Sequence, residues 1–535
     1  MKNLILFFLI SLLLSGSCIQ KIRKSEIIYD TIIADTIQYH PVRLDQYGNI
    51  LPWYSSDLGE SYDTVISLVW NFWKNMETDS NGLKYYMNHQ VWRPEHDMRG
   101  LGGDQINMAL SSWALLFQYT GDLSVIENMK YIADEYLARS LSDSTCLWPY
   151  LPYPYNTEVH SGIYDGDMRN GKGYLQPDKA GNFGYELVTL YKITDDRKYL
   201  DVAASIAKVL ADKTMPGNND QSPLPFRVNA KTGQPGSFFS NTGSGRIETE
   251  AVYTANWTGT LMLFQEMIKL DAENAALYQN SFDMILGWMK EFPMKTNKWG
   301  PFFEDIPGWS NTQTNAITFA MFIMQNRDLF TNWQNDVKNI FEWTYQELGN
   351  HEYDKYGVTV MNEQTVYRVP GNSHSSRQAS MELWYTELTG DTTYKTNAIR
   401  TLNWATYTVD WDGKNRYIRD DIWLTDGYGD YVRHYLRAMA TCPALAPSHK
   451  DKLLSCSSVI KRIEYEPGNI RFNTFDDSGT AVLRISFKPK TVRDGSNKLI
   501  RQADPGKEGW TWTPLEKGGI LRIKFSGSDE VEISG

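Results

Sequence analysis

The chain has 535 residues, which is enough for one large domain and a small one. Hydrophobic residues make up 41% and charged residues 22%, as in an ordinary folded protein, and the formal net charge of −11 argues against non-specific nucleic-acid binding. The aromatic share of 13% is high; exposed Trp and Tyr often stack on sugars, although a large core also uses them.

The first residues predict an export signal. "MKN" supplies one positive charge, "LILFFLISLLL" is too short to span a bilayer as a mature helix, and "SGSC" ends at Cys18. This pattern resembles the lipobox of bacterial lipoproteins, in which the cysteine becomes the lipidated N-terminus. The resemblance implies a signal peptide at 1–18, a tether and N-terminal segment at 19–50, and attachment by lipid alone, on the periplasmic or cell-surface side of a bacterial envelope. An ordinary signal cleaved nearby is the alternative.

The remaining cysteines indicate no metal site. Cys146, Cys442 and Cys456 are far apart, and neither a CxxC motif nor zinc-ligand spacing is present. One disulfide is possible among them. We therefore expect no metal and no cofactor.

The middle of the chain repeats a helical hairpin. Three segments read alike: "ALLFQYTGDLSVIENMKYIADEYL", "ELVTLYKITDDRKYLDVAASIAKVL" and "ELWYTELTGDTTYKTNAIRTLNWATYTV". Each predicts an apolar helix, a turn built on Thr-Gly-Asp or Thr-Asp-Asp, and an amphipathic helix with apolar residues at i, i+3, i+4 and i+7. Two further segments follow the pattern more loosely. The period of about 60 to 75 residues exceeds that of solenoid repeats.

Short and long connections alternate along this region. A few residues join the helices of a pair, whereas roughly 20 to 40 residues, rich in Gly, Pro, Trp, Tyr, Asp and Arg, lead to the next pair. The first helices of the pairs are expected at about 103–119, 181–193, 252–268, 313–325, 374–389 and 427–440, with another partner at about 60–77. The pattern resembles the six-hairpin (α/α)6 toroid over residues 51–445. That resemblance implies inner helices that all begin at one rim, where the long loops build a substrate cleft.

The last part of the chain changes period. "NIRFNTF", "TAVLRISF", "GWTWTPL" and "GILRIKF" alternate with period two between Gly, Asp and Pro turns. This pattern predicts a small antiparallel β domain at 456–535. Its expected role is to pack on the toroid, with sugar binding as the alternative.

Polar and aromatic residues gather where the inner helices are expected to begin. The segment "VPGNSHSSRQAS" places Asn372, His374 and Arg377 at one such start. The other expected rim residues are His96, Arg99, Asp165, Asp167, Arg169, Trp299, Glu304, Trp309, Arg419, Asp421 and Tyr428. Taken singly, most fit a helix cap or the core, and Asp104, Asp178 and Asp426 fit N-caps. Their convergence on one rim predicts a site.

Two reactions fit these residue types. The first is β-elimination at C4–C5 of a hexuronic acid, which needs a neutralised carboxylate, a base for the C5 proton and an acid for O4. We expect His374, Tyr428, Arg377 and Asn372 to carry it. His96, Arg99, Arg169, Trp299, Trp309 and Arg419 would bind the substrate. The second is glycoside hydrolysis by paired carboxylates, drawn from Asp165, Asp167, Glu304 and Asp421.

The chain is similar to uronate-active toroid enzymes of bacterial polysaccharide utilisation, namely polysaccharide lyases, ulvan-oligosaccharide dehydratases and unsaturated glucuronyl hydrolases. It lacks the adjacent Asp-Asp of mannan hydrolases on an inner helix, because Asp420 and Asp421 fall in a loop. Elimination is thus the leading hypothesis. The resemblance implies a monomer that acts on an acidic polysaccharide or its oligosaccharides. A non-enzymatic glycan-binding lipoprotein is the third possibility.

Overall fold

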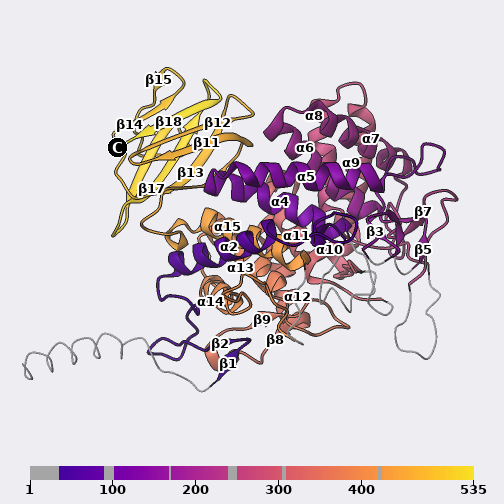
Figure 1. The fold of residues 1–535 in the computed structure, drawn as a ribbon, viewed down its shortest axis with the longest axis horizontal. Coiled ribbons are helices and arrows are strands. Elements are labelled where there is room, and N and C mark those ends of the chain that lie inside the picture. Colours follow the sequence, from indigo (N-terminus) through magenta and orange to yellow (C-terminus); the bar gives the residue numbers. More distant parts are fainter. Residues whose placement is uncertain are drawn as a thin grey trace, which may run out of the picture.

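The computed structural model describes residues 35–88, 102–158, 160–167, 170–238, 250–303, 309–419 and 425–535. The helices form the main part, and the C-terminal strands, coloured yellow, lie beside them (Figure 1). Cys18 lies outside the described residues. Of the helices that are described, none has both the length and the apolar content needed to cross a membrane. Cys146, Cys442 and Cys456 are free thiols.

The inner helices form a closed ring. Each contacts the next in the order α4, α6, α8, α11, α13 and α15, and α15 contacts α4. Their bounds are α4 Gly103–Thr120, α6 Pro177–Thr194, α8 Thr258–Leu270, α11 Gln313–Gln325, α13 Asn372–Thr389 and α15 Thr425–Thr441. An inner helix has neighbours on both sides and an outer helix behind it, so its side chains are buried around most of its circumference.

Outer helices surround the ring. They are α2 Leu58–Lys74, α5 Leu123–Ser140, α7 Arg197–Lys213, α9 Ala275–Glu291, α12 Trp333–Leu348 and α14 Lys395–Thr406. Five of them follow an inner helix along the chain and pack against it, while α2 packs on α15 and completes the sixth pair. This arrangement confirms the predicted (α/α)6 toroid. The short helices are α3 Tyr85–Asn88, α10 Pro293–Thr296, η1 Arg327–Leu329, η2 Asp354–Tyr356 and η3 Pro443–Leu445.

The Thr-Gly-Asp turns end one helix and begin the next. Gly121 closes α4 with a left-handed φ of 69°, and Asp122 then caps α5 by accepting the Ser124 N–H at 2.9 Å. In the Thr-Asp-Asp version, Asp195 takes the left-handed φ of 57° and Asp196 caps α7. A left-handed Gly or Asp followed by Asp therefore marks the tight turn of three hairpins, α4–α5, α6–α7 and α13–α14.

Two inner helices begin away from their predicted positions. α8 begins at Thr258 rather than near 252, because the preceding backbone bonds to neighbouring loops: the Ala255 N–H donates to the Trp299 carbonyl at 3.1 Å. α6 begins four residues before the predicted 181, with Pro177 in the first turn, where its missing N–H costs nothing. Asp104 and Asp178 lie inside the first turns of α4 and α6 rather than at the N-cap positions.

The C-terminal domain is a sandwich of two antiparallel sheets. One has the order β10-β13-β17-β16 and the other β11-β12-β18-β14-β15. The bounds are β10 Lys452–Cys456, β11 Ile460–Glu466, β12 Asn469–Thr474, β13 Gly479–Ile485, β14 Thr491–Asp494, β15 Asn497–Lys498, β16 Gly509–Pro514, β17 Gly519–Phe525 and β18 Glu530–Ser534. Gln118 Nε2 donates to the Leu454 carbonyl at 3.1 Å, and Tyr465 Oη donates to the Gln118 carbonyl. The sandwich thus packs at the C-terminal end of α4, away from the inner-helix starts.

Residues 35–50, predicted to belong to a tether and N-terminal segment, pack on the toroid. His40 stacks on Trp53 with ring centroids 3.9 Å apart, and its Nε2 lies 2.9 Å from the Val409 carbonyl oxygen. Val42 and Ile50 are fully buried. The short strands of the chain are β1 Thr36–Ile37, β2 His40–Pro41, β3 Tyr155–Asn156, β4 Tyr164–Asp167, β5 Gly171–Lys172, β6 Tyr174–Leu175, β7 Val228–Asn229, β8 Gly349–Asn350 and β9 Val360–Met361.

Candidate functional site

Two neighbouring cavities open among the inner helices. The rim cavity, of about 30 Å³, lies at the starts of α11, α13 and α15. Its polar lining includes Glu363, Asn372, His374, Arg377, Tyr417 and Asp430. The axial cavity, of about 90 Å³, is lined from five inner helices and so follows the axis of the ring. Its polar lining includes Asp104, Asn107, Lys179, Glu186, Arg433 and Arg437. Met108 and Thr314 line both cavities.

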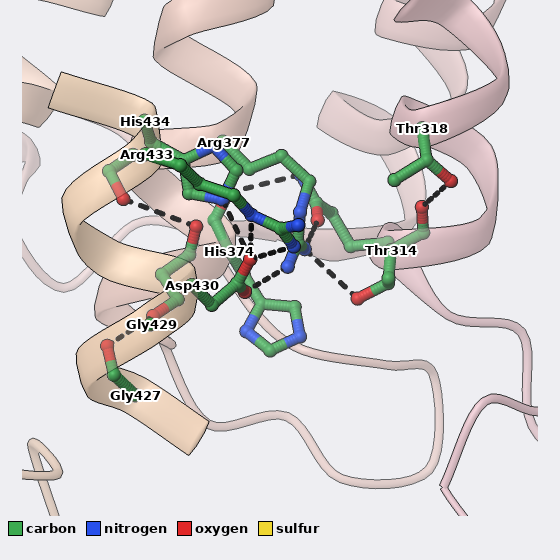
Figure 2. A network of polar contacts seen from close by, with 12 residues as sticks. Thr314, Thr318, His374, Arg377, Gly427, Gly429, Asp430, Arg433 and His434 are labelled. Atoms are coloured by element: carbon green, nitrogen blue, oxygen red, sulfur yellow. Dashed lines mark hydrogen bonds and ion pairs between the residues drawn. The ribbon is translucent and has the colours of Figure 1, made fainter. Parts of the chain in front are cut away.

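His374 projects into the rim cavity from the first turn of α13. Figure 2 shows its imidazole apart from the contacts that join Arg377 and Asp430. The side chain is 7% exposed, and no described group lies within hydrogen-bond distance of its Nε2. Burial, assisted by the charge of Arg377, lowers the pKa of His374 to about 3. The ring is therefore neutral near pH 7, with one nitrogen available to a ligand.

Arg377 lines the rim cavity and bonds to the neighbouring helices α11 and α15. Its Nη1 donates to Gln313 Oε1 at 2.7 Å and to Thr314 Oγ1 at 2.9 Å, while Nη2 contacts the Asp430 carboxylate (Figure 2). The residue is 1% exposed. Sequence reasoning expected a guanidinium offered to a substrate carboxylate, but most of its donors are already used by α11 and α15.

Asn372 also has a structural task. Its Nδ2 donates to Asn415 Oδ1 and to Thr408 Oγ1, and Asn415 in turn donates to the Gly427 carbonyl at 2.7 Å. These bonds tie the start of α13 to the start of α15. Asn372 therefore holds the rim together, although it lies at the cavity surface.

Tyr428, predicted as a proton carrier, does not line the rim cavity. It is 0% exposed, and its ring stacks on Phe72 of α2 with centroids 5.4 Å apart. Tyr417 lies there instead, and its hydroxyl donates to Glu363 Oε1 at 2.7 Å. Burial holds the pKa of the Tyr417 hydroxyl well above its usual value, so that hydroxyl keeps its proton.

Asp430 is the centre of a buried charge cluster. Its carboxylate contacts Arg377, Arg433 and His434, with His434 Nε2 at 2.9 Å from Oδ1 (Figure 2). Burial alone would raise its pKa, but Arg377, Arg433 and His434 hold the pKa of Asp430 well below its usual value. Burial likewise keeps the pKa of His434 low, so that ring is neutral. One carboxylate thus faces two guanidiniums, which leaves a net positive charge.

The predicted sugar platforms and arginines are dispersed. Trp299 is 0% exposed and packs near Phe319 and Trp343, so its assignment as a sugar platform is wrong: no face of the indole is open to a sugar. Trp309 is 37% exposed and lies beside Tyr253. Arg419 is exposed but is not among the residues that line either cavity. His96, Arg99 and Arg169 lie outside the described residues.

The described carboxylates of the predicted hydrolase pair do not reach the cavities. Asp165 pairs with the exposed Lys172 at 2.9 Å and accepts the Thr157 hydroxyl at 2.7 Å. Asp167 is fully buried against Arg227, with Oδ2 at 3.0 Å from Nε. Both therefore serve the β4–β5 hairpin. Glu304 and Asp421, which would complete the pair, lie outside the described residues.

Sequence reasoning missed Glu363, Tyr417 and the polar face of α15. Asp430, Arg433, His434 and Arg437 recur at i, i+3, i+4 and i+7 on a helix whose other positions are mostly apolar. This stripe is a detectable signal of a polar lining. Glu363 and Tyr417 lie in loops of no regular period, and nothing in the sequence marks them.

No family model and no curated protein matches the chain. Solved structures do share its fold. Cellobiose 2-epimerase from Spirochaeta thermophila aligns with a TM-score of 0.54 and 13% identity over 72% of this chain and 97% of that one. D-mannose isomerase aligns with a TM-score of 0.52 and 9% identity over 72% of this chain and 99% of that one. Cellobiose 2-epimerase from Bacillus thermoamylovorans aligns with a TM-score of 0.51 and 13% identity over 70% of this chain and 98% of that one. At such identities the likeness establishes the fold of the helical domain.

Proposed function

We propose that the protein is a carbohydrate-active lyase or dehydratase that eliminates the C4 substituent of a hexuronic acid, in an acidic polysaccharide or its oligosaccharides. The observation that carries this proposal is His374, a neutral imidazole whose Nε2 has no partner among the described residues. Such a group is unprotonated at one ring nitrogen near neutral pH and can accept a proton there, and the negative charge of a bound substrate carboxylate would raise its pKa toward the working pH that a general base needs. The printed names of the three structures reported above are those of sugar enzymes, which supports a sugar substrate.

His374 is the proposed base. Its Nε2 takes the C5 proton, the electrons of that C–H bond form the C4–C5 double bond, and the C4–O4 bond breaks. Tyr417 keeps its proton in the buried rim and, on giving up its hydrogen bond to Glu363, donates that proton to the departing oxygen. Both side chains line the rim cavity, and the net positive cluster around Asp430 adjoins it and stabilises the negative charge that builds up on the substrate carboxylate.

The test is an assay on a panel of uronate oligosaccharides. Elimination produces a conjugated unsaturated uronate, so ultraviolet absorbance rises during turnover. Replacement of His374 by Gln lowers the rate by roughly 10²–10⁴-fold, as expected for loss of a general base. His351→Gln is the matched control, because that histidine is exposed and bonds only to Asp354 nearby at 2.9 Å.

Other products would assign the site differently. Saturated fragments as the only products, with full activity in His374→Gln, would favour the paired-carboxylate hydrolase. A rearranged sugar of unchanged mass would indicate isomerisation or epimerisation. If every preparation binds glycan but forms no product, the protein is a non-enzymatic glycan-binding lipoprotein.

The proposed location is a bacterial envelope membrane, by way of lipid on Cys18. Cys18→Ser should move the protein from the membrane fraction to the soluble fraction, because a single cysteine carries the whole anchor. Cys146→Ser is the control and should leave the fractionation unchanged, since that thiol lies within the folded toroid. Retention of Cys18→Ser in the membrane fraction would refute lipidation.

A further inference from the structure

The base of the axial cavity holds an arginine that has no ion-pair partner among the described residues. Arg433 and Arg437 line this cavity from successive turns of α15. Arg433 shares Asp430 with Arg377, whereas no hydrogen bond or ion pair joins Arg437 to another described residue. Burial and the charge of Arg433 lower the pKa of Arg437 to about 9, which still leaves it a cation near pH 7. Arg377 and Arg433 therefore share the Asp430 carboxylate, and Arg437 adds a third guanidinium without a carboxylate paired to it.

Glu186 does not cancel this excess. It lines the same cavity from α6, but its carboxylate makes no hydrogen bond or ion pair with any described residue. Burial raises the pKa of Glu186 to about 7, even though Arg433 and Arg437 oppose the shift, so about half of the molecules carry a neutral carboxylic acid there at neutral pH.

Polar atoms farther up the cavity are also unpartnered. Asn107 is 7% exposed and Thr258 is 4% exposed, and neither Asn107 Oδ1 nor Thr258 Oγ1 has a hydrogen-bond partner among the residues that are placed. Both residues line the axial cavity. A buried polar atom without a partner costs about 1–3 kcal/mol, so a ligand or water that bonds to them is favoured. The volume of about 90 Å³ is enough for several waters or a small anion.

We infer that the base of the axial cavity is a binding site for a small carboxylate, held by Arg437 together with Arg433. Arg437 lies seven residues beyond Asp430 on α15, roughly 10 Å deeper along the helix, so this site is separate from the rim cavity of His374. The carboxylate is that of a free small acid or of a sugar acid. In the second case Asn107 and Thr258 bond to its hydroxyl groups.

Calorimetric titration of the whole protein tests the site. Sodium acetate and sodium glucuronate should both bind and compete with each other, while glucose should bind at least about tenfold more weakly than glucuronate, because it lacks the charge. Tighter binding of glucuronate than of acetate identifies a sugar acid, and equal binding identifies a free acid. Absence of competition, or glucose as tight as glucuronate, overturns the inference.

Two variants with opposite expected effects separate binding from folding. Arg437→Gln should weaken acetate binding at least about tenfold, as loss of a charge-assisted bond implies. Glu186→Gln should strengthen it, because a competing negative charge is removed. Arg462→Gln is the matched control, since that arginine lies exposed on β11. Acetate binding of wild-type affinity in Arg437→Gln would refute the site. If Arg437→Gln does not fold, unchanged or weaker acetate binding in Glu186→Gln would refute it instead.

The carboxylate site does not depend on the proposed reaction. His374→Gln should bind acetate as the wild type does while its elimination rate falls. If His374→Gln keeps full activity, the proposed reaction fails and the anion site stands. If acetate does not bind the wild type, the anion site fails and the proposed reaction stands.

Discussion

Asp167 and Asp430 are both buried aspartates in contact with arginine, but the charges around them differ. Among the described residues Asp167 contacts one cation, Arg227, and accepts Gln176 Nε2 at 3.0 Å, so that ion pair by itself is balanced. Asp430 faces Arg377 and Arg433 at once, beside a cavity. A balanced buried pair fixes a hairpin, whereas an unbalanced one beside open space is suited to an anionic ligand. Charge balance, more than burial, distinguishes the two aspartates.

Asp430→Asn should have the largest effect on stability. Removal of one partner from a buried ion pair typically costs about 3–5 kcal/mol, and here two arginines lose their carboxylate together. The free energy of unfolding in urea is the measurement. Added acetate should restore part of the loss, because an anion in the axial cavity faces Arg433, one of the two arginines that lose their carboxylate. A decrease of less than about 1 kcal/mol in the free energy of unfolding would contradict the buried ion pairs of Asp430 with Arg377 and Arg433.

Asp167→Asn should lower the free energy of unfolding by a similar amount, about 3–5 kcal/mol. Arg227 is the arginine that loses its carboxylate in this variant. Acetate should give no specific rescue, because Arg227 lines neither the rim cavity nor the axial cavity and the ion pair is fully buried. Urea unfolding with and without acetate measures both quantities. Equal rescue of the Asp167 and Asp430 variants would remove the distinction between the two clusters.

Glu382 offers a third case, a buried carboxyl with no cation. Burial raises its pKa to about 8, although Gln378 and Tyr345 oppose the shift. A raised acid pKa means that folding takes up a proton, so stability should fall as pH rises from about 4.5 to about 8, by at most about 1.4 kcal/mol per pH unit. Glu382→Gln should flatten this dependence in unfolding experiments across that range. An unchanged slope in the variant would show that Glu382 is ionised in the fold.

Tyr428→Phe should have the smallest effect. Tyr428 stacks on Phe72 and does not line the rim cavity, so loss of its hydroxyl should change the elimination rate less than about twofold and stability by about 1 kcal/mol. Tyr417→Phe is the matched comparison and should lower the rate by roughly 10²-fold or more. If Tyr428→Phe instead lowered the elimination rate more than Tyr417→Phe, Tyr428 would be the proton carrier that the sequence predicted.

Much of the fold was present in local sequence signals. Gly121 followed by Asp122 ends one helix and caps the next through contacts within a few residues, and such contacts repeat with the hairpins. The alternation at period two in the last part of the chain likewise predicted its strands. These features depend on backbone conformation and on one buried face, both of which neighbouring residues determine.

The candidate site was only partly predictable. The sequence placed His374 and Arg377 at a helix start, but only the closed ring decides which side of α13 faces the axis, because this helix is buried nearly all round and its apolar period does not mark that side. The same packing turned Tyr428 and Trp299 into the core and brought Glu363 and Tyr417 to the rim from loops 54 residues apart. Sequence therefore determined the helices and their order, and the tertiary structure decided which polar groups meet, since those meetings depend on the closure of the ring.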